Sequence, residues 1–133
     1  MKKQLSALLF MFMALVMICG ITVNAVEPRY AYTTSASSYL TISYNKASCI
    51  SSVSANKSVT KISATQYLEK KNGRTWSTVS GCVWSDSSNR NSLTMSNSKS
   101  SLSSGTYRLR TVFTVYNGTN YETVEKISTE VTI

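Results

Sequence analysis

The residue types that carry out most enzyme chemistry are scarce in this sequence. It has no histidine, and it has only six acidic residues among 133. Histidine is the common general base at neutral pH, the usual partner of a nucleophilic serine or cysteine, and a frequent zinc ligand. A glycosidase needs two carboxylates that face one bond, and the spacing of the acidic residues indicates no such pair. The sequence therefore predicts a protein that is not an enzyme and that holds no metal ion or cofactor.

Basic and aromatic residues near the C-terminus are better candidates for a binding site. Arg108 and Arg110 lie two positions apart in a run with strand character, so both leave the strand on one side, and Tyr116 shares that side. Cations beside aromatic rings suit a glycan or a wall polymer. The alternative is a paired and solvated strand face, in which a tight turn at residues 117 and 118 sets Arg110 opposite Glu125.

The two tryptophans receive different predictions. Trp76 follows an Asn-Gly turn signal and is predicted to anchor the core. Trp84 stands beside a polar loop, where it lies either at the edge of the core or in an exposed contact with a ligand. Trp84 therefore joins the two arginines and Tyr116 as a candidate binding residue. The chain has no signature of a nucleic-acid-binding fold, so we expect no nucleic-acid partner.

The first 25 residues have the features of a signal peptide. Lys2 and Lys3 form a positive start, residues 5–23 carry no charge, and small residues precede position 26, as a cleavage site requires. A membrane anchor is the alternative, but the apolar stretch is short for a bilayer span. We expect a secreted, extracellular protein without integral membrane association after cleavage. Its 12 remaining basic residues against 6 acidic ones favour polyanionic partners, or serve only solubility.

Cys49 and Cys82 form the candidate disulfide of the exported chain. An oxidising compartment and an even number of cysteines favour a bond between them. The alternative is two unconnected, buried thiols.

The elements that must position these residues are strands. Beyond a linker at residues 26–38, residues 39–133 alternate apolar and polar positions between frequent turn signals, and no helical periodicity of useful length occurs. The run 105–118 predicts the central strand, with Tyr107 and the apolar residues in phase with it on the buried side. A bulge is expected near Glu125. We predict an all-β antiparallel sandwich of about seven strands.

The motif Gly105-x-Tyr107-x-Leu109 resembles the tyrosine corner of immunoglobulin-like and fibronectin-like domains, in which the tyrosine hydroxyl bonds to upstream backbone. With the spacing of Leu68, Trp76 and Val79 around an Asn-Gly turn, it is similar to small secreted immunoglobulin-like proteins of Gram-positive bacteria (Firmicutes). The resemblance covers about residues 40–133 and implies a sandwich of that type. The family has no assigned activity, so no functional residue carries over. An antibody domain has a cysteine where this chain has Leu109, so the candidate disulfide is not the usual inter-sheet bond.

These observations together predict a secreted, non-enzymatic binding or structural module that acts at the cell envelope or outside the cell. The expected partner is a wall polymer, a glycan or a surface protein. The alternative is a small cationic toxin or antimicrobial protein that acts on anionic membranes, although no amphipathic helix is indicated for insertion.

Overall fold

The computed structural model describes residues 29–133, so the predicted signal peptide at residues 1–25 lies outside the described residues. Eight strands follow one another along the described chain. They are β1 (Thr33–Ser43), β2 (Lys46–Ala55), β3 (Lys61–Asn72), β4 (Thr75–Ser88), β5 (Ser92–Lys99), β6 (Thr106–Asn117), β7 (Asn120–Ile127) and β8 (Val131–Thr132).

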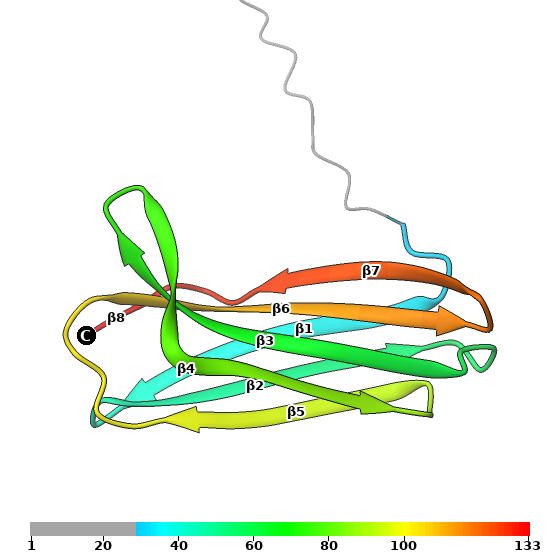
Figure 1. Cartoon of the computed structure of the whole chain (residues 1–133), viewed down its shortest axis with the longest axis horizontal. Helices are drawn as coiled ribbons and strands as arrows, with labels where there is room; N and C mark the ends of the chain where they lie inside the picture. The colour runs from blue at the N-terminus through cyan, green and yellow to red at the C-terminus, as the bar shows by residue number, and fades with distance from the viewer. Residues whose placement is uncertain (1–28) are drawn as a thin grey trace, which may run out of the picture.

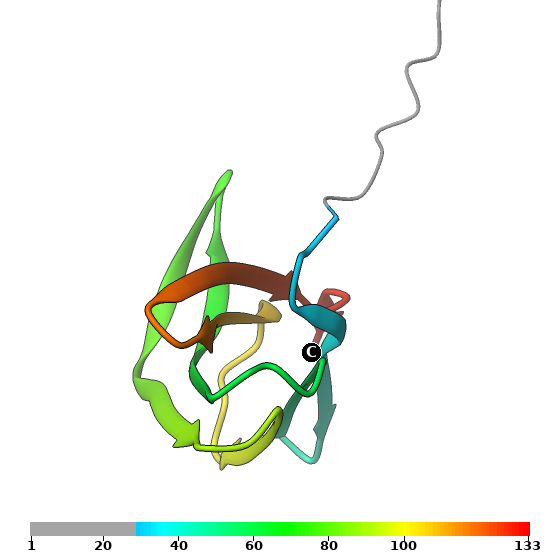
Figure 2. The same ribbon diagram turned by 90° about the vertical axis from the view of Figure 1, so that its right-hand side faces the viewer.

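The strands form two antiparallel sheets that pack as a sandwich (Figures 1 and 2). Sheet A has the order β1-β2-β5, and sheet B has the order β4-β3-β6-β7, with β8 paired to the start of β6. This confirms the predicted all-β sandwich, while its immunoglobulin- or fibronectin-like type stays a prediction. Within residues 29–133, no helix is long and apolar enough to cross a membrane.

Strand β6 is central in sheet B, as predicted. It pairs with β3 on one side and with β7 and β8 on the other. Its odd-numbered residues from Tyr107 to Val115 are all buried, and its even-numbered ones are partly exposed. The Tyr107 hydroxyl donates a 2.7 Å hydrogen bond to the carbonyl of Ser103, which is the backbone contact that the tyrosine-corner pattern predicts.

The interior consists of two apolar clusters with a belt of polar side chains between them. Ile62, Phe113 and their neighbours form one cluster, and Leu68, Leu109 and their neighbours form the other. The belt has one polar residue on each of five strands, located between residues of the two clusters. Its members are Ser38, Ser51, Gln66, Asn97 and Thr111.

Hydrogen bonds join the belt into a chain. The Thr111 hydroxyl lies 3.1 Å from that of Ser38 and 2.6 Å from that of Ser51. Gln66 donates to the Ser51 hydroxyl at 2.7 Å and accepts from the Asn97 amide at 2.8 Å. In the described part of the chain, every buried side-chain nitrogen and oxygen has a hydrogen-bond partner, so no buried polar atom of the belt is left unpaired, as a buried polar network requires.

The predicted boundary between linker and domain is wrong. Strand β1 begins at Thr33, so residues 33–38 belong to sheet A and not to the linker predicted at 26–38. The final strand is not continuous, because residues 128–130 separate β7 from β8. No bulge occurs near Glu125: Phe113 pairs with Val124 in regular register, and Val124 faces the core while Ile127 faces solvent.

A carboxylate on β7 fastens the start of the described chain to sheet B. Glu122 accepts hydrogen bonds from the backbone N–H groups of Ala31, Tyr32 and Thr33 at 2.7–2.9 Å, and from the Thr33 hydroxyl at 2.9 Å. Burial works to raise the pKa of Glu122, but these four hydrogen bonds outweigh it and hold the pKa below its ordinary value.

The predicted disulfide is not formed. Cys49 on β2 and Cys82 on β4 are free thiols, and both are completely buried in the same apolar cluster. Burial, and to a lesser degree the neighbouring Cys82, raises the pKa of Cys49 to about 12. Burial also raises the pKa of Cys82. Such groups stay protonated and behave as small apolar side chains, which is the alternative that the sequence left open.

Candidate functional site

The four predicted binding residues lie in different parts of the sandwich. Arg108, Arg110 and Tyr116 share the outer face of sheet B, which confirms that they leave β6 on one side. Tyr116 is six residues beyond Arg110, a separation of about 20 Å along a strand. Trp84 lies on β4 and faces inward beside Gln66. These residues therefore do not form one site.

The two arginines are bound to a carboxylate between them. The Glu69 carboxylate receives a hydrogen bond from Arg108 Nε at 2.8 Å and one from Arg110 Nε at 3.1 Å. The Arg108 guanidinium lies over the ring of Trp76 and the Arg110 guanidinium over the ring of Tyr67, each 4.2 Å from the ring centroid. We call these five residues the arginine cluster. Its charges and rings are largely engaged with one another.

Glu69 is buried, and Glu125 does not lie opposite Arg110 as predicted. Glu69 is only 5% exposed and is not the surface residue that its place in a hairpin suggests. Glu125 stands opposite Val112, and Arg110 stands opposite Ile127, because the loop between β6 and β7 consists of residues 118 and 119. Arg110 still reaches Glu125 diagonally, with 3.6 Å between Nη1 and the carboxylate. The ion pairs fit the alternative of a paired strand face.

Trp76 is not a core anchor. Between the pairs Tyr67–Val83 and Glu69–Thr78, strand β4 holds three more residues than β3. An odd number of extra residues turns the side chains that follow to the other face. Gly81, with φ of 75°, supplies the unusual backbone of this bulge. Trp76 therefore lies on the outer face, and the hairpin tip turns away from the body of the sandwich (Figure 1).

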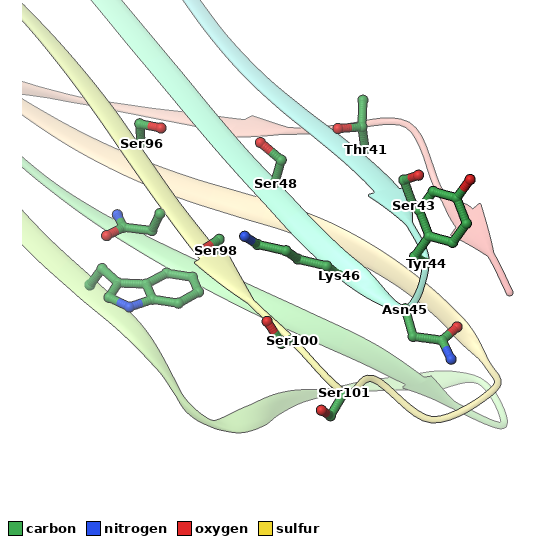
Figure 3. Close-up of a pocket in the computed structure, with 12 residues that line it drawn as sticks. Thr41, Ser43, Tyr44, Asn45, Lys46, Ser48, Ser96, Ser98, Ser100 and Ser101 are labelled. Atoms are coloured by element: carbon green, nitrogen blue, oxygen red, sulfur yellow. The ribbon is translucent and has the colours of Figure 1, made fainter.

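A broad depression lies at the end of sheet A, next to the β1–β2 turn. It is an open groove of about 1040 Å³. We call it the Tyr44–Trp84 groove. Figure 3 draws the side chains that line it, which come from β1, the β1–β2 turn, β2, β4, β5 and the segment after β5. The full lining is Thr41, Ser43, Tyr44, Asn45, Lys46, Ser48, Trp84, Ser96, Asn97, Ser98, Ser100 and Ser101.

Strained backbone is concentrated at this groove. Within residues 29–133, the non-glycine residues with positive φ are Tyr44 (50°), Asn45 (58°) and Ser101 (59°), and all three line the groove. A hydrogen bond of 2.9 Å from Leu102 N to the Asn45 carbonyl ties the two strained segments together. For tyrosine this conformation costs about 1 kcal/mol, and such outliers gather at binding sites. Tyr44 is fully exposed, so no packing of its side chain offsets the strain.

Two side chains give the groove a fixed inner wall. Trp84 is half-buried and packs against both apolar clusters. Asn97 is half-buried, and its amide donates to Gln66, which is completely buried and held in turn by Ser51. The polar belt thus orients Asn97 at the groove, as a preorganised contact requires.

The lining defines what the groove can do chemically. It contains hydroxyls, two amides, two aromatic rings and one cation, Lys46, but no carboxylate, thiol or imidazole. These groups donate and accept hydrogen bonds and stack on flat rings; they offer no acid–base pair. Among residues 29–133, no group of three His, Cys, Asp or Glu side chains is placed to hold a metal ion.

Most of the groove residues are not predicted by the sequence. The sequence places Tyr44 at the end of a strand and not in a turn. Asn-Gly and Asp-Gly pairs are the reliable signals for a turn with positive φ, and Tyr44-Asn45 is neither. A usable signal exists in the alternation of the flanking strands. Leu40 and Ile42 before the turn, and Ala47 and Cys49 after it, leave residues 44 and 45 as a two-residue loop.

Comparison with known proteins gives no family model that matches the chain, and no significant match to a curated protein or to a solved structure. The resemblance to secreted immunoglobulin-like proteins of Gram-positive bacteria therefore stays a prediction.

Proposed function

We propose that the protein is a secreted, non-enzymatic binding module that acts at the cell envelope or outside the cell, and that the Tyr44–Trp84 groove is its binding site. The observation that carries the proposal is the fully exposed Tyr44 in a strained turn at the edge of this groove. An exposed aromatic ring in an unfavourable backbone conformation contributes nothing evident to folding, so a contact with a ligand is the reason to retain it.

The chemistry of the groove favours a glycan or a wall polymer as the ligand. Tyr44 offers an exposed ring on which a sugar ring stacks, and the half-buried Trp84 offers the part of its ring that lines the groove. The serine and asparagine side chains offer donors and acceptors for the sugar hydroxyls. Lys46 is the only charged residue of the lining. The groove therefore differs from a surface that attracts polyanions or anionic membranes by charge alone.

Co-sedimentation tests the proposal. The purified protein is mixed with Gram-positive cell walls, or with anionic phospholipid vesicles, over a series of salt concentrations. We expect retention on the walls that persists at high salt, because contacts in a groove are screened much less than exposed charges. Binding to both surfaces that disappears with salt would favour the cationic membrane-active alternative.

Two tyrosine variants show whether the groove is responsible. Tyr44→Asn removes the ring and relieves the turn, since asparagine tolerates positive φ. Tyr121→Asn removes another exposed ring, one that packs on Tyr116 at the outer face of sheet B. We expect the first variant to lose most of its retention on walls and the second to keep it. Equal retention by both variants would refute the groove as the site.

A further inference from the structure

The outer face of sheet A is composed almost entirely of hydroxyl side chains. Every second residue of segments 35–41, 48–54 and 92–98 points outward, and the three segments lie in register. Ten of these twelve outward residues are serine or threonine, and the others are Tyr39 and Ile50. We call these twelve residues the hydroxyl face.

The hydroxyl face is uncharged in a strongly basic protein. The chain carries a net charge of +8, yet none of the twelve outward residues is ionisable except the Tyr39 phenol. Removing a serine hydroxyl from water is far less costly than removing a charged group, provided that it finds a new hydrogen-bond partner. Such a face favours a ligand that is itself uncharged and rich in hydroxyls. The charged side chain in phase with it on β2, Lys46, lies beyond these twelve residues, in the groove.

The hydroxyls of this face have few partners within the protein. In the described residues, one hydrogen bond joins two of these side chains, between Ser52 and Thr94 at 3.2 Å. Each serine or threonine hydroxyl has one donor and two acceptor sites. Short side chains also keep the surface shallow, so that an extended chain can lie close to the strands.

The face continues the Tyr44–Trp84 groove without interruption. Thr41, Ser48, Ser96 and Ser98 belong both to the lining of the groove and to the hydroxyl face. Tyr39 lies farther along β1 on the outer face, is 65% exposed and presents a second aromatic ring there. From Tyr44 to Ser35 the strand covers about 30 Å.

We infer that the groove and the hydroxyl face form one continuous site that binds an extended, uncharged polysaccharide chain along sheet A. The inference rests on the proposed function and specifies its ligand. A polymer that enters the groove between Tyr44 and Trp84 passes Tyr39 and then lies over the serine rows. Affinity therefore increases with the length of the glycan chain until the face is covered.

Matched lysine substitutions on the two sheets test this inference. Ser52→Lys places a charge in the middle of the hydroxyl face, outside the groove. Ser63→Lys makes the same change on β3, at an equally half-exposed outward position of sheet B. The assay is retention on Gram-positive walls, before and after the anionic phosphodiester polymers of the wall have been removed by acid extraction.

We expect wild-type protein to bind the extracted walls as well as the intact ones, at low and at high salt. We expect Ser52→Lys to bind about tenfold more weakly, because the ligand must desolvate an ammonium group, and Ser63→Lys to bind like the wild type. Long soluble glycan strands should compete better than their disaccharide units.

Each other outcome overturns the inference in a recognisable way. Loss of retention after acid extraction identifies an anionic ligand. Equal retention by the two lysine variants, with Tyr44→Asn still defective, confines the ligand to the groove and leaves the proposed function intact. A change of sedimentation coefficient with Ser52→Lys means that a second copy of the chain covers the face. Absence of wild-type retention on any wall refutes the proposed function and the inference together.

Discussion

The outer face of sheet B is rich in charged and aromatic side chains that engage one another, whereas the outer face of sheet A carries hydroxyls with few partners. Glu69 holds both Arg108 and Arg110, and each guanidinium lies over an aromatic ring. Ser52 and Thr94 share a single exposed hydrogen bond on the other sheet. The charged and aromatic side chains of sheet B, which the sequence suggests as binding residues, therefore support the fold. The serine and threonine hydroxyls of sheet A remain available to a ligand.

The largest effect should come from the carboxylate that holds the arginine cluster together. Glu69→Gln removes the counterion of two guanidinium groups that are only partly buried. We therefore expect a loss of about 2 kcal/mol in the free energy of unfolding, less than the roughly 3–5 kcal/mol of a fully buried pair. Urea denaturation followed by tryptophan fluorescence measures it.

Glu125→Gln is the matched control, because Glu125 is half exposed and touches Arg110 only at 3.6 Å. Its removal should change the free energy of unfolding by less than about 0.5 kcal/mol. Equal effects of the two substitutions would mean that the arginine cluster is a solvated surface like any other.

A smaller effect is expected at Tyr107, where sheet B fixes a segment that leads to the groove. Its hydroxyl holds the Ser103 carbonyl, two residues after Ser101 in the groove lining. Tyr107→Phe should lower the free energy of unfolding by about 1 kcal/mol, the usual net value of one hydrogen bond. Tyr116→Phe, on the same strand but partly exposed, should have no effect. An unchanged denaturation midpoint for Tyr107→Phe would refute the structural role of the corner.

The sandwich could be predicted from the sequence because its signals are local. Period-two alternation and turn residues identify β6 and its buried face, and they also predict Cys49 and Val53 on the inner face of β2. The sequence does not predict how many extra residues the bulge in β4 contains. That number, three, depends on how the β3–β4 hairpin packs. That bulge places Trp76 on the outer face of sheet B. The tryptophan that packs against the core is therefore Trp84, and not Trp76 as predicted.

The site could be predicted only in part, because strand pairing brings together residues that lie far apart in the sequence. Sequence spacing correctly places Arg108 and Arg110 on one face, but their partner Glu69 comes from β3, 39 residues before Arg108. Trp84 was a candidate contact, and the structure places it in the groove lining. Tyr44, Asn97 and Ser101 converge there from three segments that no local pattern connects.

A weaker and pH-dependent effect is expected at Glu122, which binds the start of the described chain to sheet B. Its pKa is lower in the folded protein than the ordinary 4.5, so its ionised form stabilises the fold above that pH. This stabilisation is lost as the pH falls through the folded pKa. The gap in urea midpoint between wild type and Glu122→Gln should therefore be present at pH 7 and shrink at pH 3. A gap that is the same at both pH values would contradict the role of the charge.

The smallest effect should come from the hydroxyl face, and it makes the comparison between the two sheets quantitative. Ser52→Ala combined with Thr94→Ala removes an exposed hydrogen bond whose two groups water can satisfy equally well. We expect a change below about 0.5 kcal/mol in the free energy of unfolding, as for ordinary surface substitutions. A loss above about 1 kcal/mol would show that the serine rows stabilise sheet A. Both outer faces would then stabilise the fold, and the hydroxyls of sheet A would no longer be free for a ligand.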